Sequence, residues 1–174
     1  MLVLITGGSG SGKSAYAEER VLGFGKARRI YIATMFPFDE ESLKRIDRHR
    51  AMRRDKGFET VECYTDLLSA EIPEDSVVLL ECMSNLVANE MFQDNGAKEN
   101  TVDAVLQGVK TLLSKARQVV IVTNEIFSDA VSYEEETKEY QKNLGKINQA
   151  LAVLADEVVE VVYGIPVYGK GGAL

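Results

Sequence analysis

The first residues whose types and spacing could do chemistry form a glycine-rich run near the N-terminus. Residues 7–14 read Gly7-Gly8-Ser9-Gly10-Ser11-Gly12-Lys13-Ser14 and satisfy the pattern GxxxxGK[ST]. Glycines let the backbone turn tightly enough for successive N–H groups to point at one anion, and a helix beginning there adds its dipole. Lys13 is expected to reach the β- and γ-phosphates, and the Ser14 hydroxyl to bind Mg²⁺. The run therefore predicts a binding site for the phosphates of a nucleoside triphosphate.

A carboxylate at the end of a later apolar run is the candidate second metal ligand. The run Val77-Val78-Leu79-Leu80 reads as a buried strand and is followed by Glu81. In open α/β sheets, ligands bind at the carboxyl ends of the strands. We therefore expect Glu81 to hold Mg²⁺ together with Ser14, although an ordinary strand-end acid facing solvent would give the same pattern.

The single histidine, His49, lies in the most basic segment of the chain. Residues 44–56 contain seven basic and two acidic residues, a local charge of +5, so the rest of the chain sums to −12. At helical spacing Arg45, His49 and Arg53 share one face. Such a run is usually a solvated helix face, and a lone histidine is usually a surface or core residue. The alternative is an imidazole nucleophile that attacks the α-phosphorus of a nucleotide held by the arginines.

The elements that must position these residues alternate between two kinds. Short β-branched runs read as strands at residues 2–5, 29–33, 60–63, 77–80, 119–122 and 157–162. Helical patterns lie between them, at residues 13–22, 40–56, 85–92, 102–116 and 134–155. This alternation predicts an α/β fold, with an open, mostly parallel sheet flanked by helices. We expect a single domain over residues 1–174, with a polar loop at 94–100 and a loose tail at 164–174.

Composition sets broad limits on the function. The chain has 174 residues and a net charge of −7, which argues against non-specific nucleic-acid binding because that depends on dispersed Lys and Arg. The two cysteines, Cys63 and Cys82, have no metal-ligand spacing and are interpreted as small buried residues in a reducing compartment. No signal peptide or membrane span is predicted, which favours a cytoplasmic protein.

Motifs along nearly the whole chain carry a resemblance to a known family. They are residues 5–14, Tyr31-Ile32-Ala33-Thr34, Arg45-Ile46-x-x-His49-Arg50-x-x-Arg53, Thr60-Val61-Glu62, Leu79-Leu80-Glu81-Cys82, Val122-Thr123-Asn124-Glu125, residues 145–152, Ala155-Asp156-Glu157-Val158 and Gly164-Ile165-Pro166. Only the phosphate loop is common elsewhere, whereas the other motifs in this order are specific. The chain resembles the bifunctional adenosylcobinamide kinase/adenosylcobinamide-phosphate guanylyltransferases of cobalamin biosynthesis.

The resemblance implies two reactions. The first phosphorylates adenosylcobinamide with ATP or GTP, and the second passes GMP from GTP through a guanylyl-histidine to adenosylcobinamide phosphate. By position, His49 matches the guanylylated histidine, and Mg²⁺ is implied at Ser14 and Glu81. The resemblance also implies a homotrimer. The nucleotide contacts that it implies are Gly7, Gly8, Ser9, Gly10, Ser11, Gly12, Lys13, Ser14, Ala33, Thr34, Met35, Arg50, Ala51, Met52, Arg53, Glu62 and Glu81.

One segment departs from the family pattern. After Asn124-Glu125, familiar members continue Val-Gly-x-Gly-Ile-Val-Pro with basic residues following, whereas residues 126–136 here lack those glycines and the proline and end in three glutamates. If this loop handles the corrinoid, its preference differs here. Two other readings stay open at this stage: another small P-loop kinase with a structural His49, and a non-enzymatic GTP-dependent regulatory module. A guanine switch would be expected to carry Asn-Lys-x-Asp where this chain has Thr123-Asn124-Glu125-Ile126.

Overall fold

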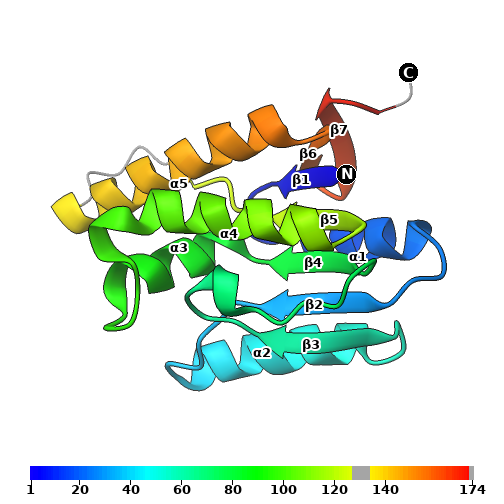
Figure 1. Cartoon of the computed structure of the whole chain (residues 1–174), viewed down its shortest axis with the longest axis horizontal. Coiled ribbons are helices and arrows are strands. Elements are labelled where there is room, and N and C mark those ends of the chain that lie inside the picture. The colour runs from blue at the N-terminus through cyan, green and yellow to red at the C-terminus, as the bar shows by residue number, and fades with distance from the viewer. Residues whose placement is uncertain (127–133, 173–174) are drawn as a thin grey trace.

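The computed structural model describes residues 1–126 and 134–172, and they form one mixed sheet with helices on both faces (Figure 1). Its seven strands run in the order β3-β2-β4-β5-β1-β6-β7. The first six strands are mutually parallel, and β7 is antiparallel to β6. The strands are β1 (Leu2–Thr6), β2 (Arg29–Ala33), β3 (Phe58–Glu62), β4 (Val77–Glu81), β5 (Gln118–Val122), β6 (Glu157–Val162) and β7 (Ile165–Lys170).

Five α-helices connect the strands and form the outer layers. They are α1 (Lys13–Gly23), α2 (Glu40–Arg53), α3 (Met83–Phe92), α4 (Thr101–Lys115) and α5 (Glu135–Leu154), with short 3-10 turns η1 (Leu67–Ser69) and η2 (Lys98–Asn100). Helices α1 and α2 lie on one face of the sheet, and α3, α4 and α5 cover the other (Figure 1). None of the helices in the described part of the chain is long and apolar enough to cross a membrane.

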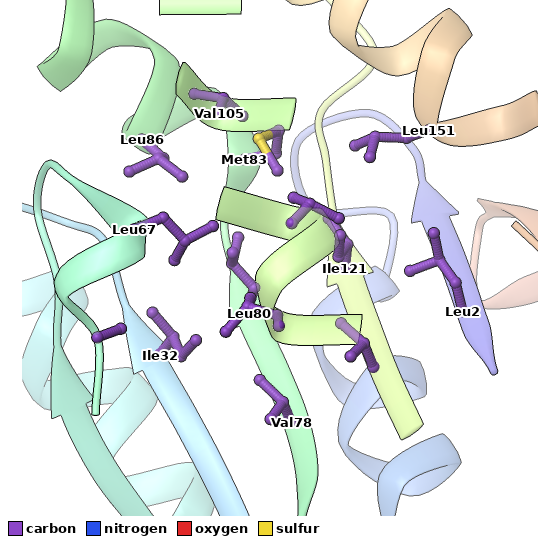
Figure 2. Close-up of a cluster of buried hydrophobic side chains, with 14 of the residues drawn as sticks. Leu2, Ile32, Leu67, Val78, Leu80, Met83, Leu86, Val105, Ile121 and Leu151 are labelled. Carbon is purple, nitrogen blue, oxygen red and sulfur yellow. The ribbon is translucent and has the colours of Figure 1, made fainter. Parts of the chain in front are cut away.

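The central strands are apolar at nearly every position because both of their faces are buried. In β1, Leu2 and Leu4 pack toward α3, α4 and α5, whereas Val3 and Ile5 pack toward α1. The larger cluster also takes Leu80 from β4, as Figure 2 shows. Continuous apolar runs are the expected signature of parallel strands covered on both sides. The predicted α/β fold with a mostly parallel sheet is therefore confirmed, and the ends of the predicted elements shift by at most three residues.

The expectation of a loose C-terminal tail was wrong. Residues 164–174 were expected as a loose tail, but residues 165–170 form β7, which pairs with β6 through registers such as Val162 with Ile165. The connecting turn is Tyr163-Gly164, and both residues have positive φ, 50° and 80°. A left-handed pair of this kind is what a two-residue hairpin requires. The glycine content of this segment suggested a loose tail, whereas Gly164 allows the tight turn of a hairpin.

Candidate active site

The phosphate loop joins β1 to α1 and has the backbone that its glycines allow. Gly12, with φ of 92°, precedes the first residue of α1, and Gly10 has φ of 73°. A Cβ added to Gly7 would come within 2.6 Å of the Val161 carbonyl oxygen, so only glycine fits there. A Cβ at Gly8 or Gly10 would instead meet open space, so these residues border room for a ligand. The loop is therefore an open cradle at a helix N-terminus, as an anion site requires.

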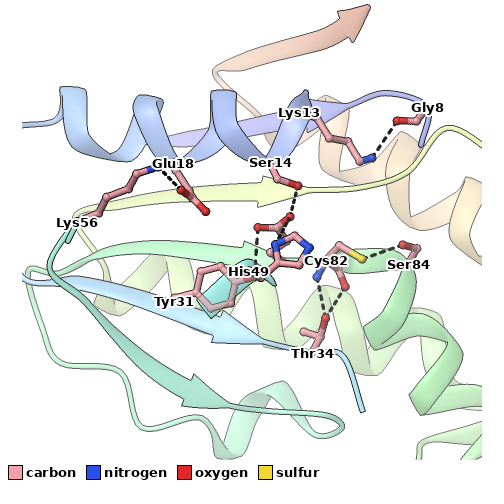
Figure 3. Close-up of polar contacts among 11 residues, drawn as sticks. Gly8, Lys13, Ser14, Glu18, Tyr31, Thr34, His49, Lys56, Cys82 and Ser84 are labelled. Atoms are coloured by element: carbon pink, nitrogen blue, oxygen red, sulfur yellow. Dashed lines mark hydrogen bonds and ion pairs between the residues drawn. The ribbon is translucent and has the colours of Figure 1, made fainter. Parts of the chain in front are cut away.

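The two predicted metal ligands meet at the carboxyl edge of the sheet. The Ser14 hydroxyl, in the first turn of α1, donates a hydrogen bond to Oε1 of Glu81, the last residue of β4 (Figure 3). The Tyr31 hydroxyl donates to Oε2 of the same carboxylate at 3.2 Å. No cluster of three or more His, Cys, Asp or Glu forms a metal site within the described residues. Two protein oxygens suit Mg²⁺, which completes its shell with phosphate oxygens and water.

Lys13 extends back over the loop that it follows. Its ammonium group donates to the Gly8 carbonyl at 3.1 Å (Figure 3). Burial lowers the pKa of Lys13, and the nearby charges of Cys82 and Glu81 oppose that shift. A bound phosphate would offer the ammonium group a charged partner in place of a backbone carbonyl. Lys13 is thus placed to exchange its internal hydrogen bond for a contact with the ligand.

His49 reaches the same carboxylate from α2. Its Nδ1 lies 3.8 Å from Glu81 Oε1, and the side chain is one-quarter exposed. Helix α2 begins with a capping box between Asp39 and Ser42, which fixes where its turns start. Ten residues after Asp39, the helix therefore presents His49 to the phosphate-loop side of the sheet. The structure brings His49, Glu81 and Ser14 together although they lie far apart in the sequence.

Arg53 is a predicted nucleotide contact that the fold buries. Its guanidinium carbon stands 3.4 Å from the centroid of the Tyr31 ring, a close cation–π arrangement. Within the described residues, Arg53 Nη1, His49 Nδ1 and Ser11 Oγ are buried without a hydrogen-bond partner. Buried polar groups are normally paired. Two of these atoms, Ser11 Oγ in the phosphate loop and His49 Nδ1 beside Glu81, lie where a polar ligand could supply the missing partner.

The other implied contacts lie farther out or have structural partners. Arg50 pairs with Glu62 at 3.2 Å, and Glu62 also accepts a hydrogen bond from Tyr64 at 3.0 Å beside a cavity of about 540 Å³. The buried Thr34 hydroxyl exchanges hydrogen bonds with the backbone of Cys82 at 2.8 and 2.7 Å. Ala33 and Met35 flank Thr34, and Ala51 and Met52 flank the inward face of α2.

Two site neighbours were missed by sequence reasoning. Tyr31 was read as part of a strand and of a family motif, without a role in the site, yet burial and then the Glu81 carboxylate raise its pKa, which keeps its hydroxyl as a donor. Glu18 in α1 is fully buried and pairs with Lys56, which follows α2. The spacing of Glu18 four residues after Ser14 was the available signal, because it places both on one helix face. The predicted burial of both cysteines is confirmed, and burial raises the pKa of Cys63 to about 11.

Comparisons with known proteins agree with this geometry. A family model described as cobinamide kinase / cobinamide phosphate guanyltransferase matches residues 3–168. The bifunctional adenosylcobalamin biosynthesis proteins CobU of Escherichia coli and of Salmonella typhimurium are 35% and 34% identical, each over 96% of this chain and 98% of its own length.

The fold is also found among solved structures. A structure of a prototypical ATPase from the type III secretion system of pathogenic bacteria is similar with a TM-score of 0.52 and 11% identity, over 91% of this chain and 51% of that one. At such low identity the likeness concerns the fold alone, which is that of the P-loop NTPases. With the family model spanning nearly its whole length, the chain belongs to the cobinamide kinase/cobinamide phosphate guanyltransferase family.

Proposed function

We propose that this protein carries out both reactions of its family on one nucleotide site. It phosphorylates adenosylcobinamide with ATP or GTP, and then transfers GMP from GTP to adenosylcobinamide phosphate through a guanylyl group on His49. The observation that supports this most is the position of His49 Nδ1, 3.8 Å from the carboxylate that also accepts the Ser14 hydrogen bond. A histidine beside the phosphate loop has no role in a simple kinase.

In the kinase step the substrate hydroxyl attacks the γ-phosphorus, and the nucleoside diphosphate leaves with the electron pair of the broken P–O bond. The loop N–H groups and Lys13 hold the phosphates and neutralise charge in the transition state. Most of the acceleration in phosphoryl transfer comes from such positioning and charge neutralisation. The same contacts would serve the second reaction, since it too starts from a triphosphate.

In the guanylyl step a nitrogen of His49 forms a bond to the α-phosphorus of GTP. The bond from that phosphorus to the bridging oxygen breaks, and pyrophosphate leaves with the electron pair. Nδ1 faces Glu81 at 3.8 Å, so we assign Nε2, on the opposite edge of the ring, as the attacking nitrogen, with the proton on Nδ1 toward the carboxylate. A phosphate oxygen of adenosylcobinamide phosphate then attacks the same phosphorus, and the P–N bond breaks.

Ser14 and Glu81 fit Mg²⁺ as its two protein ligands. Both are oxygen donors, they already share a hydrogen bond, and they lie where the cradle opens. When bound, the ion neutralises charge on the phosphates. We further propose that the protein acts in the cytoplasm. The segment 126–136 is our candidate for a difference in corrinoid preference, although residues 127–133 lie outside the described residues.

To test for the intermediate, the protein is incubated with Mg²⁺ and GTP labelled with ³²P at the α-position, and acid-labile, base-stable label on the protein is measured. We expect label on the parent and none on His49→Ala, which should keep its kinase activity toward adenosylcobinamide. A parent that binds GTP without becoming labelled would exclude the guanylyl intermediate. Label that persists on His49→Ala would assign the nucleophile elsewhere. Lys13→Ala should lose both activities because both need the phosphates held.

A further inference from the structure

The turn between β6 and β7 forms one wall of the phosphate loop. The Gly164 N–H donates to the Ser11 carbonyl at 2.8 Å, and a Cβ added to Gly12 would lie 3.4 Å from Gly164 Cα. The Val161 carbonyl borders Gly7 on the same side. Strand β6 pairs with β1, so this hairpin is fixed in place directly beside the loop (Figure 1).

Tyr163, at the tip of this turn, is an aromatic side chain without a partner. It is 94% exposed, and its ring makes no hydrogen bond or ring contact with the rest of the described chain. Its φ of 50° is a left-handed conformation that tyrosine seldom adopts. The two-residue turn requires this conformation at position 163, and restraints from the surrounding structure hold it there. The adjoining Gly164–Ser11 hydrogen bond is one such restraint.

The two sides of the loop are chemically different. Strand β4, which ends at Glu81, lies two places from β1 on one side, whereas β6 and β7 lie on the other. A P-loop lysine and the metal contact the β- and γ-phosphates. A kinase donor therefore has its γ-phosphate toward Glu81 and its base toward the β6–β7 turn. Guanylyl transfer requires the reverse, because His49 lies next to Glu81 and must meet the α-phosphorus.

We propose that the phosphate loop accepts triphosphates in two opposite directions, and that the Tyr163 ring is the stacking platform for the purine of the kinase donor. This inference rests on the proposed function. In the kinase direction the purine lies over the turn. In the opposite direction, used for guanylyl transfer, the guanosine of GTP lies toward α2 and its terminal phosphates lie in the loop, from which pyrophosphate leaves. A ring face stacks on any base, so Tyr163 would serve ATP and GTP alike.

The test compares Tyr163→Asn, which tolerates the left-handed turn but lacks the ring, with Tyr163→Phe, which keeps it. Three quantities are measured: the Kd of Mg²⁺–adenylyl imidodiphosphate by calorimetry, the kinase KM and kcat with ATP, and the rate of labelling by α-³²P-GTP below saturation. We expect Tyr163→Asn to raise Kd and KM about tenfold, the size of a lost base–aromatic stack. Its kcat and its labelling rate should stay at the parent level, and Tyr163→Phe should match the parent throughout.

The control Phe92→Asn removes an exposed aromatic ring from the end of α3 and should change none of these quantities. An unchanged Kd in Tyr163→Asn, or an equal loss in binding and labelling, would overturn the inference. If the parent has neither activity, the proposed function fails, but the calorimetric Kd still decides whether the ring binds the nucleotide. Should Tyr163→Asn fold poorly, Tyr163→Gly repeats the test because glycine also suits the turn.

Discussion

At the scale of single residues, the site is organised around one carboxylate. Glu81 accepts hydrogen bonds from Ser14 and Tyr31 on its two oxygens, and His49 approaches one of these oxygens. It is buried at the end of β4. A buried carboxylate is costly unless it is paired or hydrogen-bonded, so its neighbours are constrained to be donors or cations. This single side chain therefore links the phosphate loop to the helix that carries the histidine.

Glu81→Gln should depress both activities while leaving the fold intact. The amide has nearly the same shape and still accepts hydrogen bonds, but it lacks the charge that the proposed function assigns to Mg²⁺ binding and to the orientation of His49. We expect a loss of about a hundredfold in each rate, comparable with the removal of one preorganised electrostatic contact, and a higher Mg²⁺ concentration at half-saturation. Initial rates across a Mg²⁺ titration measure both effects.

The matched control for Glu81→Gln is Glu59→Gln. Glu59 lies at the start of β3 in an exposed pair with Arg28, away from the site. Its replacement should leave both rates and the Mg²⁺ dependence unchanged, since exposed pairs contribute little. Parent-like rates in Glu81→Gln would remove Glu81 from the chemistry and leave it a structural role.

At the scale of elements, α2 is the helix held most by polar contacts. Arg53 is its buried residue, and Arg50 and His49 make its other contacts toward the sheet. Lys56 extends this attachment just past the helix by pairing with Glu18 in α1. An unusually basic helix cannot bury a broad apolar stripe, so charged partners take over the role of packing. The position of His49 therefore depends on polar contacts and ion pairs.

Lys56→Met should destabilise the protein by leaving the Glu18 carboxylate buried without its partner. Breaking a fully buried pair costs about 3–5 kcal/mol. The Lys56 side chain is 30% exposed, so we expect a smaller loss, about 2 kcal/mol. Urea denaturation measures the change. The double variant Glu18→Gln/Lys56→Met should recover most of it, and a double variant less stable than Lys56→Met alone would contradict this account.

The sequence predicts the elements better than their contacts, for a physical reason. The strands β1, β4 and β5 were recognisable because burial on both faces requires apolar residues at nearly every position. Strand β7 was missed because an exposed edge strand needs no such pattern, and three of its six residues are Pro166, Gly169 and Lys170. Likewise Ser14 was predictable from the GxxxxGK[ST] pattern and Glu81 from its place at the end of a strand. The stacking of Arg53 on Tyr31 was not, because it depends on how α2 crosses the sheet.

At the scale of the whole molecule, acidic partners in the fold neutralise part of the positive charge that the sequence concentrates in one segment. Residues 44–56 carry a local charge of +5 in a chain of net charge −7. Arg45 pairs with Glu41, Arg50 contacts both Asp47 and Glu62, and Arg53 turns inward. Long-range attraction of a nucleotide by this segment is thereby reduced. Nucleotide binding must then depend on the short-range contacts of the phosphate loop.

We propose that the protein assembles as a homotrimer, and its surface carries a face suited to self-association. Strand β7 ends the sheet, so one edge of its backbone has no neighbouring strand in the described structure. Its side chains Ile165, Val167 and Tyr168 are exposed. Exposed apolar side chains on an edge strand favour contact with another chain. Natural oligomers are mostly closed and symmetric. Three identical contacts that involve β7 would close such a ring of three chains.

Light scattering of the purified protein should give a mass three times the 19.2 kDa of the single chain. Val167→Lys, which places a charge on the exposed face of β7, should shift that mass to one chain with an unchanged circular dichroism spectrum. Burying an unpaired lysine in a contact costs far more than leaving it in water. Phe92→Lys, on α3, is the control and should keep the parent mass. A parent of one-chain mass would refute the trimer, and a trimer that survives Val167→Lys would place the contact on another face.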